Sequence, residues 1–217
     1  MHRLRISFAA TASLVGIAFS GSGAEDSGRP TIPESALEKP VWREGIGSGF
    51  VRFTRAAGVK FSRGFGTAHF GSTQSHDLWL AQVELGTMLT GVLRPGQWYA
   101  GNFECFGQFM AGGQDRPESA YLTGLNCGLR YHFATGTRLV PFLGGSAGVV
   151  ATDIHGHDLN GVIQFNEQFG LGVRYFINQR NAISLEYAAI HISNAGLSQP
   201  NNGVNTHMVS LGFSHLF

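Results

Sequence analysis

The stretch "VSLGFSHLF", residues 209–217, alternates between two kinds of side chain. Its odd positions are mostly bulky and its even positions small: Val209, Leu211, Phe213, His215 and Phe217 against Ser210, Gly212 and Ser214. Successive side chains of a β-strand point to opposite faces. Strands that cross a membrane as a barrel alternate lipid-facing apolar residues with lumen-facing polar ones. The stretch therefore predicts one strand of a transmembrane β-barrel.

The same alternation recurs upstream. Residues 103–109 place Phe103, Cys105 and Phe109 on one face and Glu104 and Gln108 on the other. Turn signals between such segments divide the chain into eight expected strands. These are residues 44–56, 76–90, 97–111, 120–133, 138–151, 164–176, 182–194 and 205–217. We predict an all-β fold, an eight-stranded antiparallel barrel of the bacterial outer membrane, and the terminal Phe217 resembles the C-terminal signal of such barrels.

The connectors between these strands are expected to alternate in length. Short turns at 91–96, 134–137 and 177–181 would face the periplasm, and the longer segments 57–75, 112–119, 152–163 and 195–204 the exterior. Residues 57–70 could pass for a further strand. Because a ninth strand would break the alternation, we assign this stretch to extensions of the first two strands.

The N-terminal residues indicate export. His2, Arg3 and Arg5 precede an apolar run that ends in the small residues 22–24, so residues 1–24 are expected to be a signal peptide. Residues 25–41 are rich in proline and charge and are expected to form a flexible arm, followed by the barrel at 42–217. The net charge of +1, with 13% charged residues, provides no basic surface for nucleic acid.

Charged residues on the even parity of the strands are expected to meet in the lumen. Glu84, Glu104, Arg130 and Glu186 have this parity. An eight-stranded barrel is filled by its side chains, so mutual ion pairing is the expected role.

The two cysteines share the outward parity. A hairpin turning at about residue 116 would place Cys105 opposite Cys127. A strained disulfide and two lipid-facing thiols both fit this arrangement.

The stretch "HISNAGLSQPNNGVN", residues 191–205, places polar groups on the lipid-facing side of the last hairpin. His191 and Ser193 continue the outward parity of Ile183, Leu185 and Tyr187. Folding the hairpin about residue 199 would place Asn205 opposite Ser193 and His207 opposite His191. Polar side chains are costly on a lipid-facing surface, so their clustering indicates a functional site.

The spacing of these residues suits nucleophilic catalysis. Residues i and i+2 lie on one face of a strand, so His191 could take the proton of the Ser193 hydroxyl as it attacks. Asn205 would orient the imidazole in the position that a carboxylate usually holds. Asn194 and the backbone amides that follow it are candidate oxyanion donors.

The segment 191–205 resembles the active-site segment of the PagL-type lipid A 3-O-deacylases, also known as acyloxyacyl hydrolase-like outer-membrane barrels. Residues 126–154 and 165–177 resemble middle strands of the same family. The resemblance implies a lipid-facing Ser-His site that hydrolyses the 3-O-linked acyl chain of lipid A in the outer leaflet, without cofactor or metal. It implies that His191 is the base, Ser193 the nucleophile and Asn194 the adjacent asparagine.

One position departs from that family, because its third catalytic residue is a glutamate where this chain has Asn205. Two other functions fit the sequence: a structural or adhesive barrel that retains the motif, and an esterase for phospholipid or other acyl esters. Both a monomer and a homodimer fit as well. His155, His157 and Asp158 could bind a metal, but histidines of an external loop are more often simply solvated.

Overall fold

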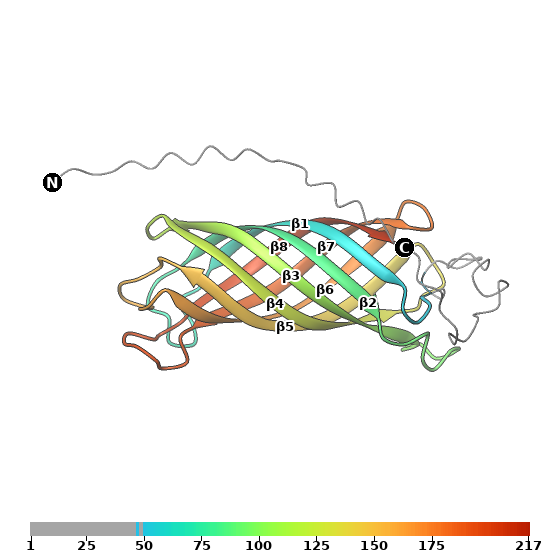
Figure 1. Cartoon of the computed structure of the whole chain (residues 1–217), viewed down its shortest axis with the longest axis horizontal. Coiled ribbons are helices and arrows are strands. Elements are labelled where there is room, and N and C mark those ends of the chain that lie inside the picture. Colours follow the sequence, from blue (N-terminus) through green and yellow to red (C-terminus); the bar gives the residue numbers. More distant parts are fainter. Residues whose placement is uncertain (1–46, 48–49) are drawn as a thin grey trace, which may run out of the picture.

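The computed structural model describes residue 47 and residues 50–217, which form a closed antiparallel barrel (Figure 1). The expected eight-stranded barrel is confirmed: each strand pairs with the next, and the first closes on the last. The strands are β1 (Arg55–Gly66), β2 (Asp77–Met88), β3 (Gly101–Arg116), β4 (Ala120–Phe133), β5 (Leu139–Thr152), β6 (Ile163–Phe176), β7 (Asn181–Ser193) and β8 (Val204–Leu216). In this part of the chain no helix is long and apolar enough to cross a membrane. The predicted signal peptide and arm lie outside the described residues.

The position predicted for the first strand is wrong. β1 occupies Arg55–Gly66, whereas we predicted 44–56, and the described residues 50–54 are not in a strand. The segment assigned to strand extensions is the strand itself. It alternates as the other strands do, with Val59 and Phe61 exposed and Lys60 and Ser62 buried.

The barrel has two unlike ends. Four connectors, 67–76, 117–119, 153–162 and 194–203, lie at what we call the loop end. The connectors 89–100, 134–138 and 177–180 lie at the other end with Phe217, which we call the terminal end (Figure 1). The predicted lengths are wrong in two places: 89–100 is long and 117–119 is short. β3 and β4 stay paired as far as Gln114 and Ala120, so the first residues of the predicted 112–119 loop belong to β3 instead.

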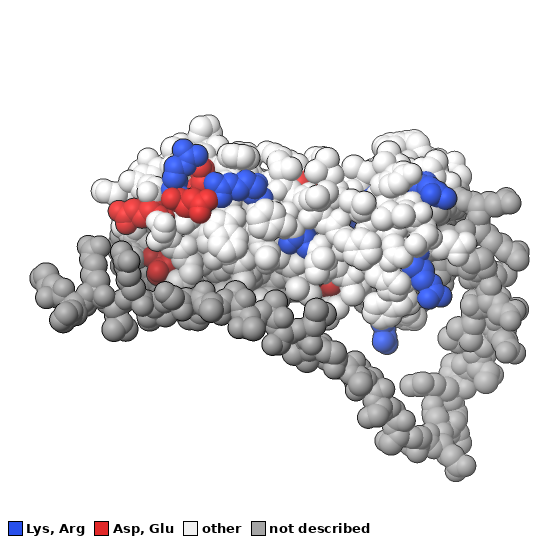
Figure 2. Space-filling view, turned by 90° about the horizontal axis from the view of Figure 1, so that it is seen from above, with Lys and Arg blue, Asp and Glu red and all other residues white. Residues whose placement is uncertain are grey.

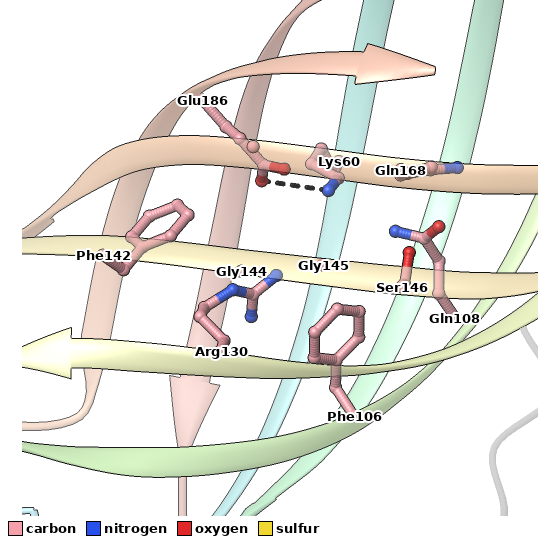
Figure 3. Close-up of a pocket in the computed structure, with 11 residues that line it drawn as sticks. Lys60, Phe106, Gln108, Arg130, Phe142, Gly144, Gly145, Ser146, Gln168 and Glu186 are labelled. Carbon is pink, nitrogen blue, oxygen red and sulfur yellow. Dashed lines mark hydrogen bonds and ion pairs between the residues drawn. The ribbon is translucent and has the colours of Figure 1, made fainter. Parts of the chain in front are cut away.

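The lumen contains a layer of ion pairs between two apolar layers. Lys60 binds Glu84 and Glu186 at 3.1 and 3.0 Å, and Arg130 binds Glu84 and Glu104 at 3.2 and 3.0 Å. The predicted placement of these acids and Arg130 in the lumen is thereby confirmed. Figure 3 shows Arg130 between Phe106 and Phe142, near the Lys60–Glu186 pair.

Apolar clusters lie above and below this charged layer. The loop-end cluster is Leu78, Leu80, Met110, Leu122, Val150, Ile154, Leu159, Ile190, Ile192, Val204 and Met208. The terminal-end cluster is Phe50, Ala56, Met88, Val140, Phe176, Ala182 and Leu216. Both clusters pack to near-zero exposure, so the strands that carry the outward polar residues rest on a filled interior.

Both cysteines are free thiols. Cys105 pairs with Leu129 and Cys127 with Gly107, so the predicted opposition of the two cysteines is wrong by two residues. The shift arises because the hairpin turns about residue 117 rather than 116.

Candidate functional site

The β7–β8 hairpin places His191 directly opposite Asn205. We predicted Asn205 opposite Ser193 and His207 opposite His191, and this register is wrong by two residues, since His207 pairs with Ala189. The physical reason lies in the turn. Asn194 folds the start of the connector by accepting from the Gly196 N–H at 2.9 Å, which shifts the hairpin centre toward β7.

Asn205 holds the His191 ring in one orientation. Nδ1 of His191 lies 2.7 Å from Oδ1 of Asn205, and Nδ2 of Asn205 donates to the backbone oxygen of His69 at 2.7 Å. The carbonyl of His69 requires a donor, so Oδ1 must be the atom that faces the ring. The Nδ1–H of His191 therefore donates to Oδ1, and Nε2 is left as the proton acceptor.

The loop-end segment 67–70 covers Asn205 from outside. Asn205 belongs to the outward face of β8 yet is only 9% exposed, because this segment folds over it. A groove of about 360 Å³ lies between the segment and the outer faces of β7 and β8. Its lining includes Thr67, His69, Phe70, Ala189, Ile190, His191, Asn205, Thr206 and His207. The imidazole thus stands in a hollow of the barrel's outer surface.

Gly203 supports the ring from the hairpin connector. Its backbone has φ +81°, and a Cβ placed there would lie 2.6 Å from Cε1 of His191. Only glycine allows this close approach together with this backbone conformation. Gly203 and Asn205 together fix the position and the tilt of the imidazole.

Ser193 ends β7 two residues beyond His191 and is half-buried on the same face. Its pairing partner on β6 is Phe165. Within the described residues no hydrogen bond joins its hydroxyl to His191. In ligand-free enzymes such bonds are often long and tighten only with substrate.

Asn194 forms its side-chain hydrogen bonds within the loop end rather than toward Ser193. Its side chain is 1% exposed, and Nδ2 donates to the oxygens of Asn160 and Ser198 at 3.0 Å each and to Oγ of Ser198 at 2.9 Å. The side chain therefore shapes the turn. The backbone N–H of Ala195, a residue with φ +53°, has no acceptor among the described residues, so it is the free donor nearest to Ser193 in sequence.

Asp158 ties three loop-end connectors together. Its carboxylate accepts from the backbone N–H groups of Thr73 and Gln74 at 2.7 and 2.9 Å, and from His76 Nε2 at 2.9 Å. Burial raises the pKa of Asp158, but the hydrogen bonds from His76 and Thr73 outweigh it and hold this pKa well below its usual value. The backbone oxygen of Asp158 accepts from the N–H groups of residues 202 and 203, next to the His191 ring.

The histidines of the 153–162 connector do not form a metal cluster. His155 and His157 are exposed, whereas Asp158 is buried against His76. Residue 47 and residues 50–217 contain no group of three His, Cys, Asp or Glu side chains that could hold a metal ion.

Comparison with known proteins places the chain in a family. The model of the family described as lipid A 3-O-deacylase (PagL) matches residues 79–214, from β2 to β8. The chain belongs to the PagL family. This match spans β7 and β8, so it includes the His191 and Asn205 pair.

One relative by sequence and two solved structures are also similar to this chain. Lipid A deacylase PagL of Pseudomonas aeruginosa is 35% identical over 80 residues, which cover 36% of this chain and 43% of that protein. The crystal structure of the outer membrane enzyme PagL matches at TM-score 0.52 and 20% identity, over 70% of this chain and 97% of that one. Neisserial surface protein A matches at TM-score 0.54 and 13% identity, over 75% and 97%. The fold is that of an outer-membrane barrel.

Three residues around the site of this PagL-family chain were not predicted from its sequence. Glu167 of β6 pairs with His191 and is exposed on the outward face. The backbone of His69 and the backbone of Gly203 contact the pair from two connectors. Of the three, only Glu167 could have been found from the sequence, because it is an acidic residue that shares the outward parity of Phe165 and Phe169.

Proposed function

We propose that this chain hydrolyses the 3-O-linked acyl ester of lipid A, with Ser193 as nucleophile and His191 as general base. The observation that carries the proposal is the His191–Asn205 hydrogen bond on the outward face. It gives Nε2 the role of proton acceptor, two residues from a hydroxyl on the same face.

The chemistry follows the acyl-transfer pattern. Nε2 of His191 takes the proton of Ser193 as Oγ attacks the ester carbonyl, and the C–O bond to the sugar then breaks while the imidazolium returns that proton to the leaving oxygen. Water, deprotonated by His191, cleaves the acyl-serine and releases the fatty acid. We assign the Ala195 N–H as the oxyanion donor in place of the Asn194 side chain, whose donors are bound elsewhere.

The location of the site favours an ester at a lipid surface. The site is at the loop end, and its groove opens on the outer face of the barrel beside the exposed Phe70. Figure 2 shows charged side chains gathered toward the ends of one face, with little charge between them. A lipid A molecule in the outer leaflet could present its ester here while its chains remain in the membrane.

Asn205 sets the expected rate. A carboxylate stabilises the imidazolium by charge, whereas the Asn205 amide supplies only a hydrogen bond and the correct tautomer. We therefore propose that the reaction is slower than in family members that carry glutamate.

The test is mass spectrometry of lipid A from a Gram-negative host that makes this chain in its outer membrane. Ser193→Ala, expressed to the same level, is the control. Loss of one hydroxyacyl mass in the host with the natural chain, absent with Ser193→Ala, supports the proposal.

Unchanged lipid A despite a folded, inserted barrel would contradict the proposal. Labelling of Ser193 by a serine-reactive phosphonate would then indicate another ester substrate. Absence of labelling would instead favour a barrel that retains the motif without the reaction.

A further inference from the structure

Three neighbouring strands align one row of polar side chains across the outer face of the barrel. Glu167 of β6 pairs with His191 of β7, and His191 pairs with Asn205 of β8. Asn205 forms a hydrogen bond to the ring and carries no charge. The row therefore places a carboxylate on the side of the imidazole that faces away from Asn205.

Glu167 is unusual for its position in the barrel. It lies within β6 on the exposed outward face, between Phe165 and Phe169. Within the described residues it has no ion pair or hydrogen bond, whereas outward-facing Arg63 pairs with Asp115. An unpaired carboxylate on such a face is costly, which calls for a compensating role.

The distance between the two strands suits an electrostatic role. Side chains directly opposite in an antiparallel pair have Cβ atoms about 4.5–5.5 Å apart. Opposite charges within about 4–6 Å of each other stabilise each other strongly where water is scarce. The pairing of the two backbone positions therefore allows the Glu167 carboxylate to reach this range of an imidazolium at His191 by rotation of its side chain.

We propose that Glu167 is a positioning residue that stabilises the His191 imidazolium and thereby supplies the negative charge that Asn205 lacks. This inference rests on the proposed Ser193–His191 function. The acid comes from β6, on the side of β7 opposite to the strand that carries Asn205.

Few other ionisable groups surround His191. His207 and His69 line the same groove, on β8 and on the 67–76 connector, and Tyr187 lies further along β7, hydrogen-bonded to His207. None of these side chains carries a negative charge at neutral pH. Glu167 is therefore the acidic side chain paired with His191 in the described barrel.

The test compares Glu167→Gln with Glu118→Gln, the same change at an exposed residue of the 117–119 turn at the same end of the barrel. We expect Glu167→Gln to lower kcat for lipid A deacylation about tenfold, with KM little changed, because the transition state loses charge stabilisation. The acidic limb of its pH–rate profile should move to lower pH. Glu118→Gln should change neither.

A double-mutant cycle with Asn205→Glu sharpens the test. In a background with a carboxylate on β8, Glu167→Gln should reduce kcat less than twofold, because the imidazolium already has an anionic neighbour. Equal losses in both backgrounds would overturn the proposal, as would a raised KM with unchanged kcat, which would indicate a substrate contact instead. Heat-modified migration of the folded barrel in gels verifies folding of each variant.

NMR of the histidine rings in detergent micelles separates failure of this proposal from failure of the proposed function. Signals of His191, assigned from the spectrum of His191→Gln, should titrate at lower pH in Glu167→Gln than in the natural chain. This readout requires no substrate. A shift in a chain that leaves lipid A unchanged would support the coupling and reject only the deacylase activity, whereas no shift would overturn the coupling.

Discussion

The imidazole of His191 is held by an uncharged partner, because Nδ1 lies 2.7 Å from Oδ1 of Asn205 and the Asn205 amide is locked by the carbonyl of His69. The Asn205 amide accepts a hydrogen bond from His191 through Oδ1 and donates one to His69 through Nδ2. An ionised carboxylate has no hydrogen to donate and could form only the first of these bonds. Asn205 therefore has two roles in this chain: it orients the His191 ring and it holds the 67–70 segment in place.

Replacing Asn205 should separate these two roles. Asn205→Ala removes the acceptor that fixes the tautomer, and we expect kcat for lipid A deacylation to fall about tenfold or more. Asn205→Asp keeps an acceptor for His191 but directs an oxygen at the His69 carbonyl, so it should retain more activity while loosening residues 67–70. Rates and limited proteolysis of the same samples measure both effects; equal rates for the two variants would contradict the orienting role.

Gly203→Ala should damage the site through direct contact. Its Cβ would lie 2.6 Å from Cε1 of His191, and its φ of +81° adds backbone strain, so kcat should fall about tenfold. Gly96→Ala is the matched control, since Gly96 has φ +87° and open space around the new Cβ at the terminal end. If both variants lose activity equally, backbone strain rather than displacement of His191 is the cause.

Asp158→Asn should loosen the loop end at neutral pH. The Thr73 and Gln74 amides lose a charged acceptor, and hydrogen bonds to charged groups are each worth about 1.5–3 kcal/mol. Amide hydrogen exchange of residues 72–76 should accelerate about tenfold or more. Unchanged exchange would show that other contacts hold this connector.

The natural chain should show a related pH dependence. The pKa of Asp158 is lower in the folded state than in the unfolded state, so its stabilisation is complete above about pH 4 and is lost as the pH falls below that value. Exchange protection of residues 72–76 should decrease over this acidic range in the natural chain. Asp158→Asn should lack that component.

Glu104→Ala should destabilise the whole barrel. Glu104 accepts from Arg130, Arg174 and His132 at 3.0, 3.2 and 2.8 Å in the lumen. Removing it leaves the buried Arg174 guanidinium without its ion-pair partner and leaves Arg130 with Glu84 alone, which costs about 3–5 kcal/mol. Urea titration followed by gel mobility measures the loss, and Glu118→Ala should unfold like the natural chain.

Much of the fold could be predicted because period-two alternation is a local property. Val209, Leu211 and Phe213 establish the faces of β8 without knowledge of any other strand. The first strand was misplaced because residues 57–66 alternate equally well as a strand or as an extension of one. Pairing with β2 and β8, which the sequence does not display, decides between them.

The site was only partly predictable for a similar reason. Parity was enough to place His191 and Ser193 on the outward face, but the partner of His191 depends on how the 194–203 connector folds. Asn194 sets that fold through contacts to residues 160 and 198, which are distant or loop-dependent. The cover over Asn205 likewise comes from a connector far away in the chain.

The filled lumen has a consequence for the membrane that holds this barrel. Two small cavities beside Lys60 and Arg130 measure about 20 and 10 Å³, each with space for roughly one water molecule at most, and apolar clusters lie on both sides of them. Within the described barrel, the packed side chains therefore close the lumen to ions and small hydrophilic drugs. A cell could accumulate many copies in its outer membrane without increasing that membrane's permeability.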